Sequence, residues 1–188
     1  MNSTVLRSRP VIIVTAATLL TSLTLGLAFV VVHRIYDLRG ESVEAPAAPL
    51  TAEQARQQVL GPARQFVGAG RLGDPTANYL LMSCRGDDGP PYQGSVYLTF
   101  DVPSITETPA YFREIAGAMT ARGWREGLPP NRHPGGRTLA RDGLTAIYHR
   151  HPDLPGRGVL KIYGECRTVT DHRSDTSGFL DVTAAVRR

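Results

Sequence analysis

The pattern of hydrophobic and polar positions begins with a long uncharged run. Residues 10–32 carry no charged side chain, and the run lies between Arg7 and Arg9 on one side and His33 and Arg34 on the other. An α-helix rises about 1.5 Å per residue, so about 20 apolar residues cross the roughly 30 Å of hydrocarbon in a bilayer. The run therefore predicts a transmembrane helix.

A signal peptide or a lipid anchor would account for this run less well. A cleaved signal peptide has a shorter apolar core, of roughly 7–15 residues, and a small-x-small site directly after it. The nearest such site here, from Ala45 to Ala47, lies more than ten residues beyond the run. A lipid-modified N-terminus needs a cysteine after the run, and the first cysteine is Cys84. We predict an uncleaved anchor, with a cleaved signal and a buried core helix as the alternatives.

The orientation of the anchor follows from its charges and from the cysteines. Positive charge favours the cytoplasmic side, and Arg7, Arg9 and the amino terminus give the N-terminal flank a slight excess. Both cysteines lie beyond the run, and structural disulfides belong to oxidising compartments. We therefore expect a plasma-membrane protein with a cytoplasmic N-terminus and an extracytoplasmic C-terminal domain.

The rest of the chain divides into a spacer and one domain. Residues 40–50 (GESVEAPAAPL) are small, acidic and proline-bearing, which is typical of a linker. The residues after this spacer have the length of a single domain with one core. The predicted parts are a cytoplasmic N-terminus (1–9), a transmembrane helix (10–32), a juxtamembrane linker (33–50) and an extracytoplasmic domain (51–188).

The domain opens with a helical pattern. Thr51 and Gln54 have the spacing of a capping box, and apolar residues recur at helical intervals as far as Val67. Because Pro62 has no N–H to donate, Gly61 and Pro62 should kink or split this helix.

A second helix is predicted over residues 108–122. Thr108 has the side chain of an N-cap, and Pro109 suits the first helical position. Gly123 should end the helix in a left-handed conformation, with Trp124 folding back on the last turn.

Alternating and β-branched segments predict strands between and after these helices. Asp142 and Gly143 form the strongest hairpin signal in the chain. The order of elements indicates an α+β domain, an antiparallel sheet with two helices packed on one face. The expected strands cover residues 77–85, 94–102, 137–141, 144–150 and 158–166.

Composition and charge exclude little and suggest no ligand. Of 21 basic residues only Lys161 is a lysine, and a GC-rich genome gives the same skew without any function. Beyond residue 44 there are 17 basic and 14 acidic residues, scattered evenly. This balance is too small to predict nucleic-acid binding.

The two cysteines, Cys84 and Cys166, are the best candidates for a covalent link. Alternation places Cys84 on the strand face of Leu80 and Met82, and Cys166 on the face of Ile162, so we expect both sulfur atoms in the core. A structural disulfide is the prediction. Free buried thiols are an alternative, and a redox pair lacks the C-x-x-C spacing that lowers a thiol pKa.

One segment has the residue types of a metal site. His149, His151 and Asp153 share one side of a strand, and His133 or His172 could add a ligand. The spacing resembles the metal motif of metallo-β-lactamases, but Leu154 stands where that family has another histidine. A solvated strand end is the simpler interpretation. We predict no cofactor and no catalytic residue, since no G-x-S-x-G, P-loop or H-E-x-x-H motif is present.

Two segments resemble proteins of one bacterial group. SCRGDDGPPYQGSVYL (residues 83–98) and YGECRTVTDHR (residues 163–173) are similar to uncharacterised single-pass envelope proteins of mycobacteria and related actinobacteria. The resemblance implies a location in the cell envelope and no particular activity.

Three functions are compatible with these features. The leading hypothesis is a non-catalytic, membrane-tethered extracytoplasmic domain that binds an envelope or membrane protein. A metal-dependent envelope hydrolase would use His149, His151 and Asp153. An accessory subunit of a membrane complex would pack through its transmembrane helix, where Thr18, Ser22 and Gly26 recur every four residues.

Overall fold

The computed structural model describes residues 22–24, 26–27, 48–85, 88–127, 133–175 and 178–187. The chain forms two units, Met1–Ala47 and Ala48–Arg188, which are described separately. In the first unit the described residues, 22–24 and 26–27, are helical. The predicted anchor and the stripe of Thr18, Ser22 and Gly26 otherwise lie outside the described residues. None of the helices in the described ranges has both the length and the apolar character that a membrane span needs.

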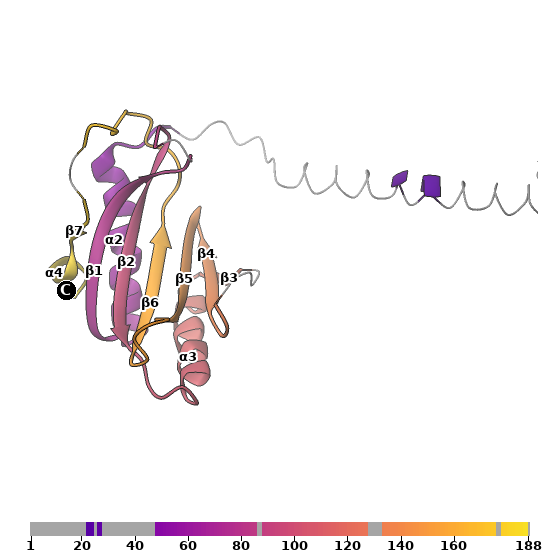
Figure 1. Ribbon diagram of the computed structural model, residues 1–188, viewed down its shortest axis with the longest axis vertical. Coiled ribbons are helices and arrows are strands. Elements are labelled where there is room, and N and C mark those ends of the chain that lie inside the picture. The colour runs from indigo at the N-terminus through magenta and orange to yellow at the C-terminus, as the bar shows by residue number, and fades with distance from the viewer. Residues whose placement is uncertain are drawn as a thin grey trace, which may run out of the picture. The chain divides into compact units, whose positions relative to one another are not determined.

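The second unit is built on one sheet of seven strands (Figure 1). The spatial order is β3-β4-β5-β6-β2-β1-β7, and every neighbouring pair is antiparallel. This matches the predicted α+β class with an antiparallel sheet. The strands are β1 (Gly73–Ser83), β2 (Tyr92–Asp101), β3 (Arg125–Glu126), β4 (Arg137–Arg141), β5 (Leu144–Arg150), β6 (Arg157–Tyr163) and β7 (Leu180–Asp181).

Helix α2 (Ala52–Ala69) begins at the predicted capping box. The Thr51 hydroxyl accepts a hydrogen bond from the Gln54 N–H, and the Gln54 side chain accepts one from the Thr51 N–H. The helix runs unbroken through Pro62, so of the two predicted outcomes, a kink or a split, the split does not occur. Pro62 is itself buried among other buried residues of the helix, and this packing outweighs the one missing backbone hydrogen bond.

Helix α3 (Thr108–Thr120) ends two residues before the predicted Arg122, and its N-cap also differs from the prediction. The N-cap is Glu107, not Thr108, whose hydroxyl instead donates to the Ser104 carbonyl over 2.8 Å and lies inside the first turn. At the other end Gly123 has φ +87°, and the Trp124 N–H donates to the Met119 carbonyl over 3.2 Å. The predicted left-handed cap is confirmed.

The two long helices cover the same face of the sheet, as Figure 1 shows. The core between them contains Phe66 from α2, Phe112 from α3 and inward side chains of β1, such as Tyr79. Leu80 therefore points to the opposite, open face, where it lines a shallow hollow with Met82 and other residues. The prediction that Leu80 and Met82 mark the core face was wrong.

Close packing of α2 on the sheet depends on a glycine in β2. A Cβ atom on Gly94 would lie 2.3 Å from the Ala55 carbonyl oxygen, well inside van der Waals contact. The absence of a side chain therefore lets the helix backbone approach the strand directly.

The C-terminal part contains both confirmed and unpredicted elements. Asp142 and Gly143 both have positive φ, 48° and 74°, and join β4 to β5 in the predicted hairpin. After β6 the chain adds β7 and a short helix, α4 (Thr183–Val186), beside β1. Neither element was predicted, because two and four residues are too few to show a hydrophobic period.

Candidate binding site at the edge of the sheet

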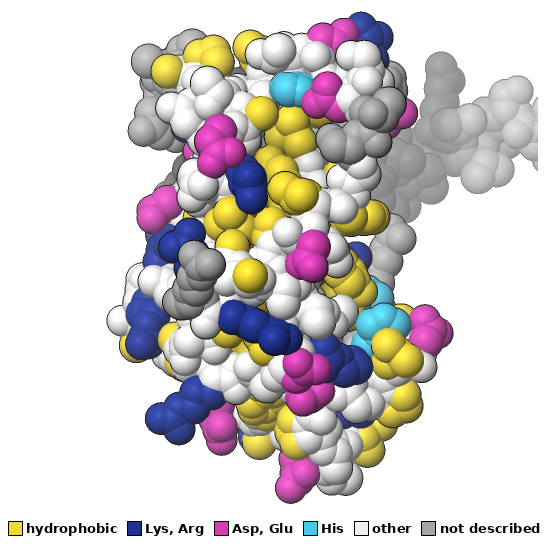
Figure 2. All heavy atoms as spheres, turned by 90° about the vertical axis from the view of Figure 1, so that its left-hand side faces the viewer, with side chains coloured by type: hydrophobic (Ala, Val, Ile, Leu, Met, Phe, Trp, Pro, Cys, Tyr) yellow, Lys and Arg dark blue, Asp and Glu magenta, His cyan; other side chains and the backbone are white. Residues whose placement is uncertain are grey.

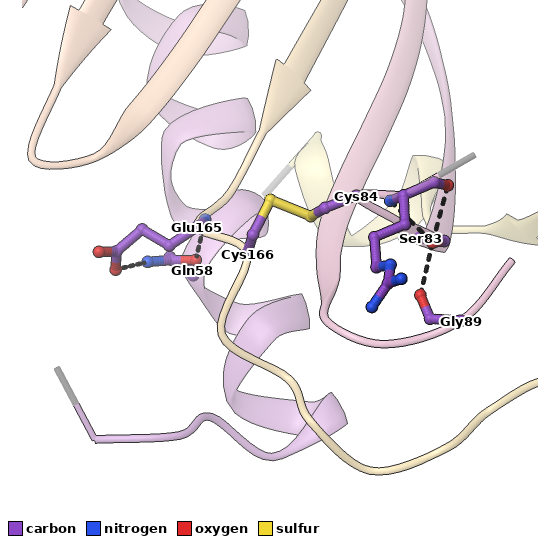
Figure 3. The surroundings of a disulfide bond; sticks show 7 residues. Gln58, Ser83, Cys84, Gly89, Glu165 and Cys166 are labelled. Carbon is purple, nitrogen blue, oxygen red and sulfur yellow. Dashed lines mark hydrogen bonds between the residues drawn. A yellow bond between two sulfur atoms is a disulfide. The ribbon is translucent and has the colours of Figure 1, made fainter. Parts of the chain in front are cut away.

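The structure joins Cys84 and Cys166 in a disulfide, with 6.1 Å between their Cα atoms (Figure 3). Neither residue lies in a strand: Cys84 comes after β1, and Cys166 lies in the bend after β6. Cys166 is exposed and Cys84 is half-buried, so the bond lies at the end of the sheet and not in the core. The prediction from strand faces, which placed both sulfur atoms inside, was wrong.

The chain next to this disulfide is fixed to both layers of the domain. The Gln58 side chain, on α2, accepts from the Glu165 N–H over 3.0 Å and donates to the Glu165 carboxylate over 2.6 Å (Figure 3). On the sheet side, the Thr168 and Tyr92 backbones exchange hydrogen bonds of 3.1 and 2.7 Å. The segment after the disulfide is thereby attached to the start of β2.

The start of the domain is attached to the same place. The Leu50 N–H donates to the Arg167 carbonyl over 2.9 Å, and the Arg167 side chain donates back to the Ala48 carbonyl over 3.1 Å. The residues that enter α2 therefore lie beside the residues that come after Cys166.

The side chain of His172 is held by one aromatic and one polar contact. Its ring packs edge-on against the Tyr92 ring, with centroids 5.4 Å apart. Its Nδ1 atom lies 2.7 Å from the Asp175 carboxylate. Because a carboxylate only accepts, Nδ1 carries the proton and, in the neutral ring, Nε2 is left as an acceptor. The Nε2 atom is buried and has no hydrogen-bond partner.

A cavity of about 240 Å³ opens between this segment and the outer edge of β1. Figure 2 views this edge of the domain and shows hydrophobic side chains along the middle of the face, with a histidine and acidic groups above them. The lining residues are Tyr79, Leu80, Leu81, His172, Asp175, Gly178 and Leu180.

Tyr79 contributes a second polar atom without a partner. Its side chain is 8% exposed, and its hydroxyl is buried and makes no hydrogen bond. Burial raises the pKa of Tyr79 to about 12, although the Arg56 guanidinium, 6.0 Å from the ring centroid, acts in the opposite direction. At neutral pH Tyr79 is therefore a hydrogen-bond donor.

The cavity is thus lined by apolar side chains together with Tyr79 and His172. The two polar atoms without partners, the Tyr79 hydroxyl and His172 Nε2, are buried within these residues and present no accessible surface. Pockets that bind small ligands are mostly apolar with a few polar side chains, which is also the composition of this lining.

The residues predicted as weak metal candidates do not form a common site. His149 is 4% exposed; its Nδ1 lies 2.7 Å from the Arg150 carbonyl, and its ring stacks on His133 at 3.6 Å. Burial lowers the pKa of His149. His151 accepts from the Asp153 N–H over 3.1 Å. Across the described ranges, no three histidine, cysteine or acidic side chains are grouped to bind a metal.

Sequence reasoning missed the residues of the cavity. Tyr79 stands in an apolar strand and looks like an ordinary core residue, and His172 was considered only as an additional metal ligand. The part of the sequence that could have pointed to this site is the segment YGECRTVTDHR, because it contains both Cys166 and His172. No pattern within that segment indicates that it lies against β1.

The fold and the site define a small α+β domain with one disulfide and a cavity of about 240 Å³ at the edge of an antiparallel sheet. The chain belongs to the family described as "Putative lipoprotein LppJ", whose model matches residues 51–185. Proteins of that description from Mycobacterium tuberculosis strain H37Rv and from Mycobacterium bovis are 39% identical to it over 129 residues, which is 69% of this chain and 67% of theirs.

These relatives confirm the predicted resemblance to mycobacterial proteins. Neither the family description nor the names of the relatives indicate an enzyme. No solved structure matches the chain significantly.

Proposed function

We propose that this protein is a membrane-tethered, non-catalytic accessory domain of the cell envelope that binds a partner at the edge of its sheet. The observation that carries the proposal is the cavity of about 240 Å³ beside β1, lined by Leu80, Leu81 and Leu180 together with Tyr79 and His172. The relatives' description as lipoproteins supports an envelope location.

The tether in this proposal is the apolar run at residues 10–32, with the N-terminus in the cytoplasm. Lipid anchors are commonly attached through cysteine. Both cysteines of this sequence, Cys84 and Cys166, are occupied by the disulfide, which favours a protein anchor over a lipid one. A disulfide also favours an oxidising compartment for the domain.

Site-specific photocrosslinking in a mycobacterium tests the binding role. A photoreactive amino acid at Leu180 lies at the cavity, and the same amino acid at Leu154 serves as the matched control, since both leucines are about half exposed (47% and 51%) but Leu154 does not line the cavity. We expect an adduct of defined mass at Leu180 that is absent at Leu154. Equal adducts at both positions would show general surface contact and would contradict the proposal.

Protease treatment of spheroplasts tests the location in the same cells. An extracytoplasmic domain should be degraded while the residues before the run stay protected, and the protein should stay in the membrane after carbonate washing. A domain that is degraded only after the membrane is permeabilised would reverse the proposed orientation.

A further inference from the structure

The open face of the sheet, opposite the two long helices, carries the shallow hollow that Leu80 and Met82 line. The hollow has a volume of about 160 Å³ and shares only Leu80 with the cavity at the edge of β1. The register of β2 and β6 pairs Ser95 with Tyr163 and Tyr97 with Lys161. The other walls of the hollow are formed by these four side chains and by Phe179, which comes just before β7.

Ser95 gives this hollow a buried polar group without a partner. The residue is 9% exposed, and its hydroxyl makes no hydrogen bond to the described part of the chain. Unlike the hydroxyl of Tyr79, it is not fully enclosed. Buried polar groups in folded proteins almost always have a partner, so a vacant hydroxyl in the wall of a hollow points to a bound ligand.

Lys161 gives the hollow its charge. No other charged residue lines it, and the ammonium group has no ion pair with the described residues. Its Nζ atom lies 5.8 Å from the centre of the Tyr97 ring. Three aromatic side chains line the hollow and could surround an alkylammonium group, but the positive charge of Lys161 repels such a ligand. The charge favours an anion.

The two tyrosines supply further donors to an anion. Burial raises the pKa of Tyr97 and the pKa of Tyr163, so both phenol groups keep their proton at neutral pH. Neither hydroxyl has a hydrogen-bond partner among the residues that the structure describes. Together with Ser95, the lining therefore has three hydroxyl groups that can donate, beside one ammonium group.

We propose that this hollow binds a carboxylate carried on an apolar group, at a site independent of the cavity beside β1. The carboxylate lies between Lys161 and Ser95, and the apolar group lies against Met82 and Phe179. Ser95 and Lys161 are diagonal neighbours on adjacent strands, about 7–8 Å apart, which one carboxylate and a long lysine side chain can bridge.

Charge and size define this ligand further. The single ammonium group of Lys161 balances the single charge of a carboxylate, whereas a phosphate monoester carries about 1.5 to 2 negative charges. The volume of about 160 Å³ is well below the roughly 300–1,000 Å³ of sites for drug-sized molecules. The hollow therefore holds a small carboxylic acid or the carboxyl end of a longer molecule.

Binding of 4-fluorophenylacetate to the full-length protein in detergent micelles, followed by fluorine NMR, tests the proposal. We expect this carboxylate to bind at least about tenfold more tightly than its neutral analogue 4-fluorophenylacetamide, because the amide has no charge to pair with Lys161. Equal affinities would overturn the proposal. Displacement by an equal concentration of acetate would also overturn it, because acetate has no apolar group.

Two variants of Lys161 separate the charge from the shape of the side chain. Lys161→Met keeps an unbranched chain and removes the charge, so it should weaken binding at least about tenfold, whereas Lys161→Arg keeps the charge and should stay within about threefold. Ser95→Ala should weaken binding about fivefold, and Ser104→Ala, in the loop before α3, should have no effect. Unchanged binding in Lys161→Met would overturn the site.

The single lysine allows the same test without any substitution. Lys161 is the only lysine in the chain, so acetylation by an activated ester modifies one side chain and the terminal amine, which serves as the internal control. At a concentration of 4-fluorophenylacetate about four times its Kd, acetylation of Lys161 should slow about fivefold, since only the free fraction reacts. Equal slowing of both amines, or no slowing at Lys161, would overturn the proposal.

Discussion

Replacement of Tyr79 by phenylalanine should make the free protein more stable. The substitution removes one hydroxyl, which is buried and makes no hydrogen bond. A buried polar group without a partner costs about 1–3 kcal/mol. Because the phenylalanine ring fills the same space in the core, we expect the free energy of unfolding to rise by about 1 kcal/mol.

Tyr148 provides a control with the same chemistry and the opposite expectation. It is 1% exposed, and its hydroxyl donates to the Phe112 carbonyl over 3.0 Å. Tyr148→Phe removes that bond and should lower the free energy of unfolding by about 1 kcal/mol. The two identical substitutions should therefore differ by about 2 kcal/mol in stability.

The single tryptophan makes the measurement possible in the full-length protein. Trp124 is the only tryptophan in the chain, and it is 1% exposed in the core of the domain, so its fluorescence reports unfolding of the domain alone. If the free energy of unfolding falls by about 2 kcal/mol per molar urea, each substitution should move the urea midpoint by about 0.5 M. If Tyr79→Phe lowered the midpoint as much as Tyr148→Phe, the Tyr79 hydroxyl would have a partner, and the assignment of a buried, unpaired hydroxyl would be wrong.

Three further predictions test other parts of the structure. Cys84→Ser and Cys166→Ser should each destabilise the domain by the same amount, about 2–4 kcal/mol, and the double variant should be no less stable than either single variant. Alkylation of two thiols in denatured, unreduced protein from membranes would show that the bond is absent. Because burial lowers the pKa of His149 below its ordinary 6.5, the stability that this histidine contributes is complete above pH 6.5 and falls as the pH drops below that value. The decrease in the urea midpoint between about pH 7.5 and about pH 5 should therefore be smaller in His149→Phe than in the unchanged protein. An equal decrease in both proteins would assign the pH dependence to other groups. Gly94→Ala places a Cβ 2.3 Å from a carbonyl oxygen of α2 and should lower the free energy of unfolding by about 2 kcal/mol or more, which urea unfolding would show; a change below about 0.5 kcal/mol would mean that the helix moves away freely.

Local signals in the sequence predicted the parts of the fold that depend on neighbouring residues. The capping box at Thr51 and the turn at Asp142 and Gly143 are each made by residues close together in the chain, and both are present in the structure. The turn at Gly123, which follows α3, depends in the same way on one residue that accepts positive φ.

The face of β1 could not be predicted in this way. Tyr79, Leu80, Leu81 and Met82 are apolar residues in direct succession, so a period of two does not indicate which pair is inward. The packing of Tyr79 beneath α2 decides the outcome, and this packing depends on Gly94 in the neighbouring strand. The predicted position of the cysteines relative to the core was wrong for the same reason.

The candidate site was harder still to predict, because its two walls are far apart in the sequence. Tyr79 and His172 are separated by 93 positions and by most of the sheet's strands. Their proximity depends on β7, which has only two residues, and on the backbone contacts of Thr168 with Tyr92. Neither of these has a pattern that can be recognised before the fold is known.

The attachment of residues 48–50 to Arg167 has a mechanical consequence. The linker that leads into α2 is held by hydrogen bonds to the residue directly after Cys166. A pull along the linker therefore divides between two paths: the backbone that continues into α2, and the hydrogen bonds to Arg167, whose neighbour Cys166 is joined by the disulfide to Cys84 after β1. Part of any tension on the tether would thus pass to the end of the sheet, and the pair of hydrogen bonds at Arg167 would break before the covalent links on either path.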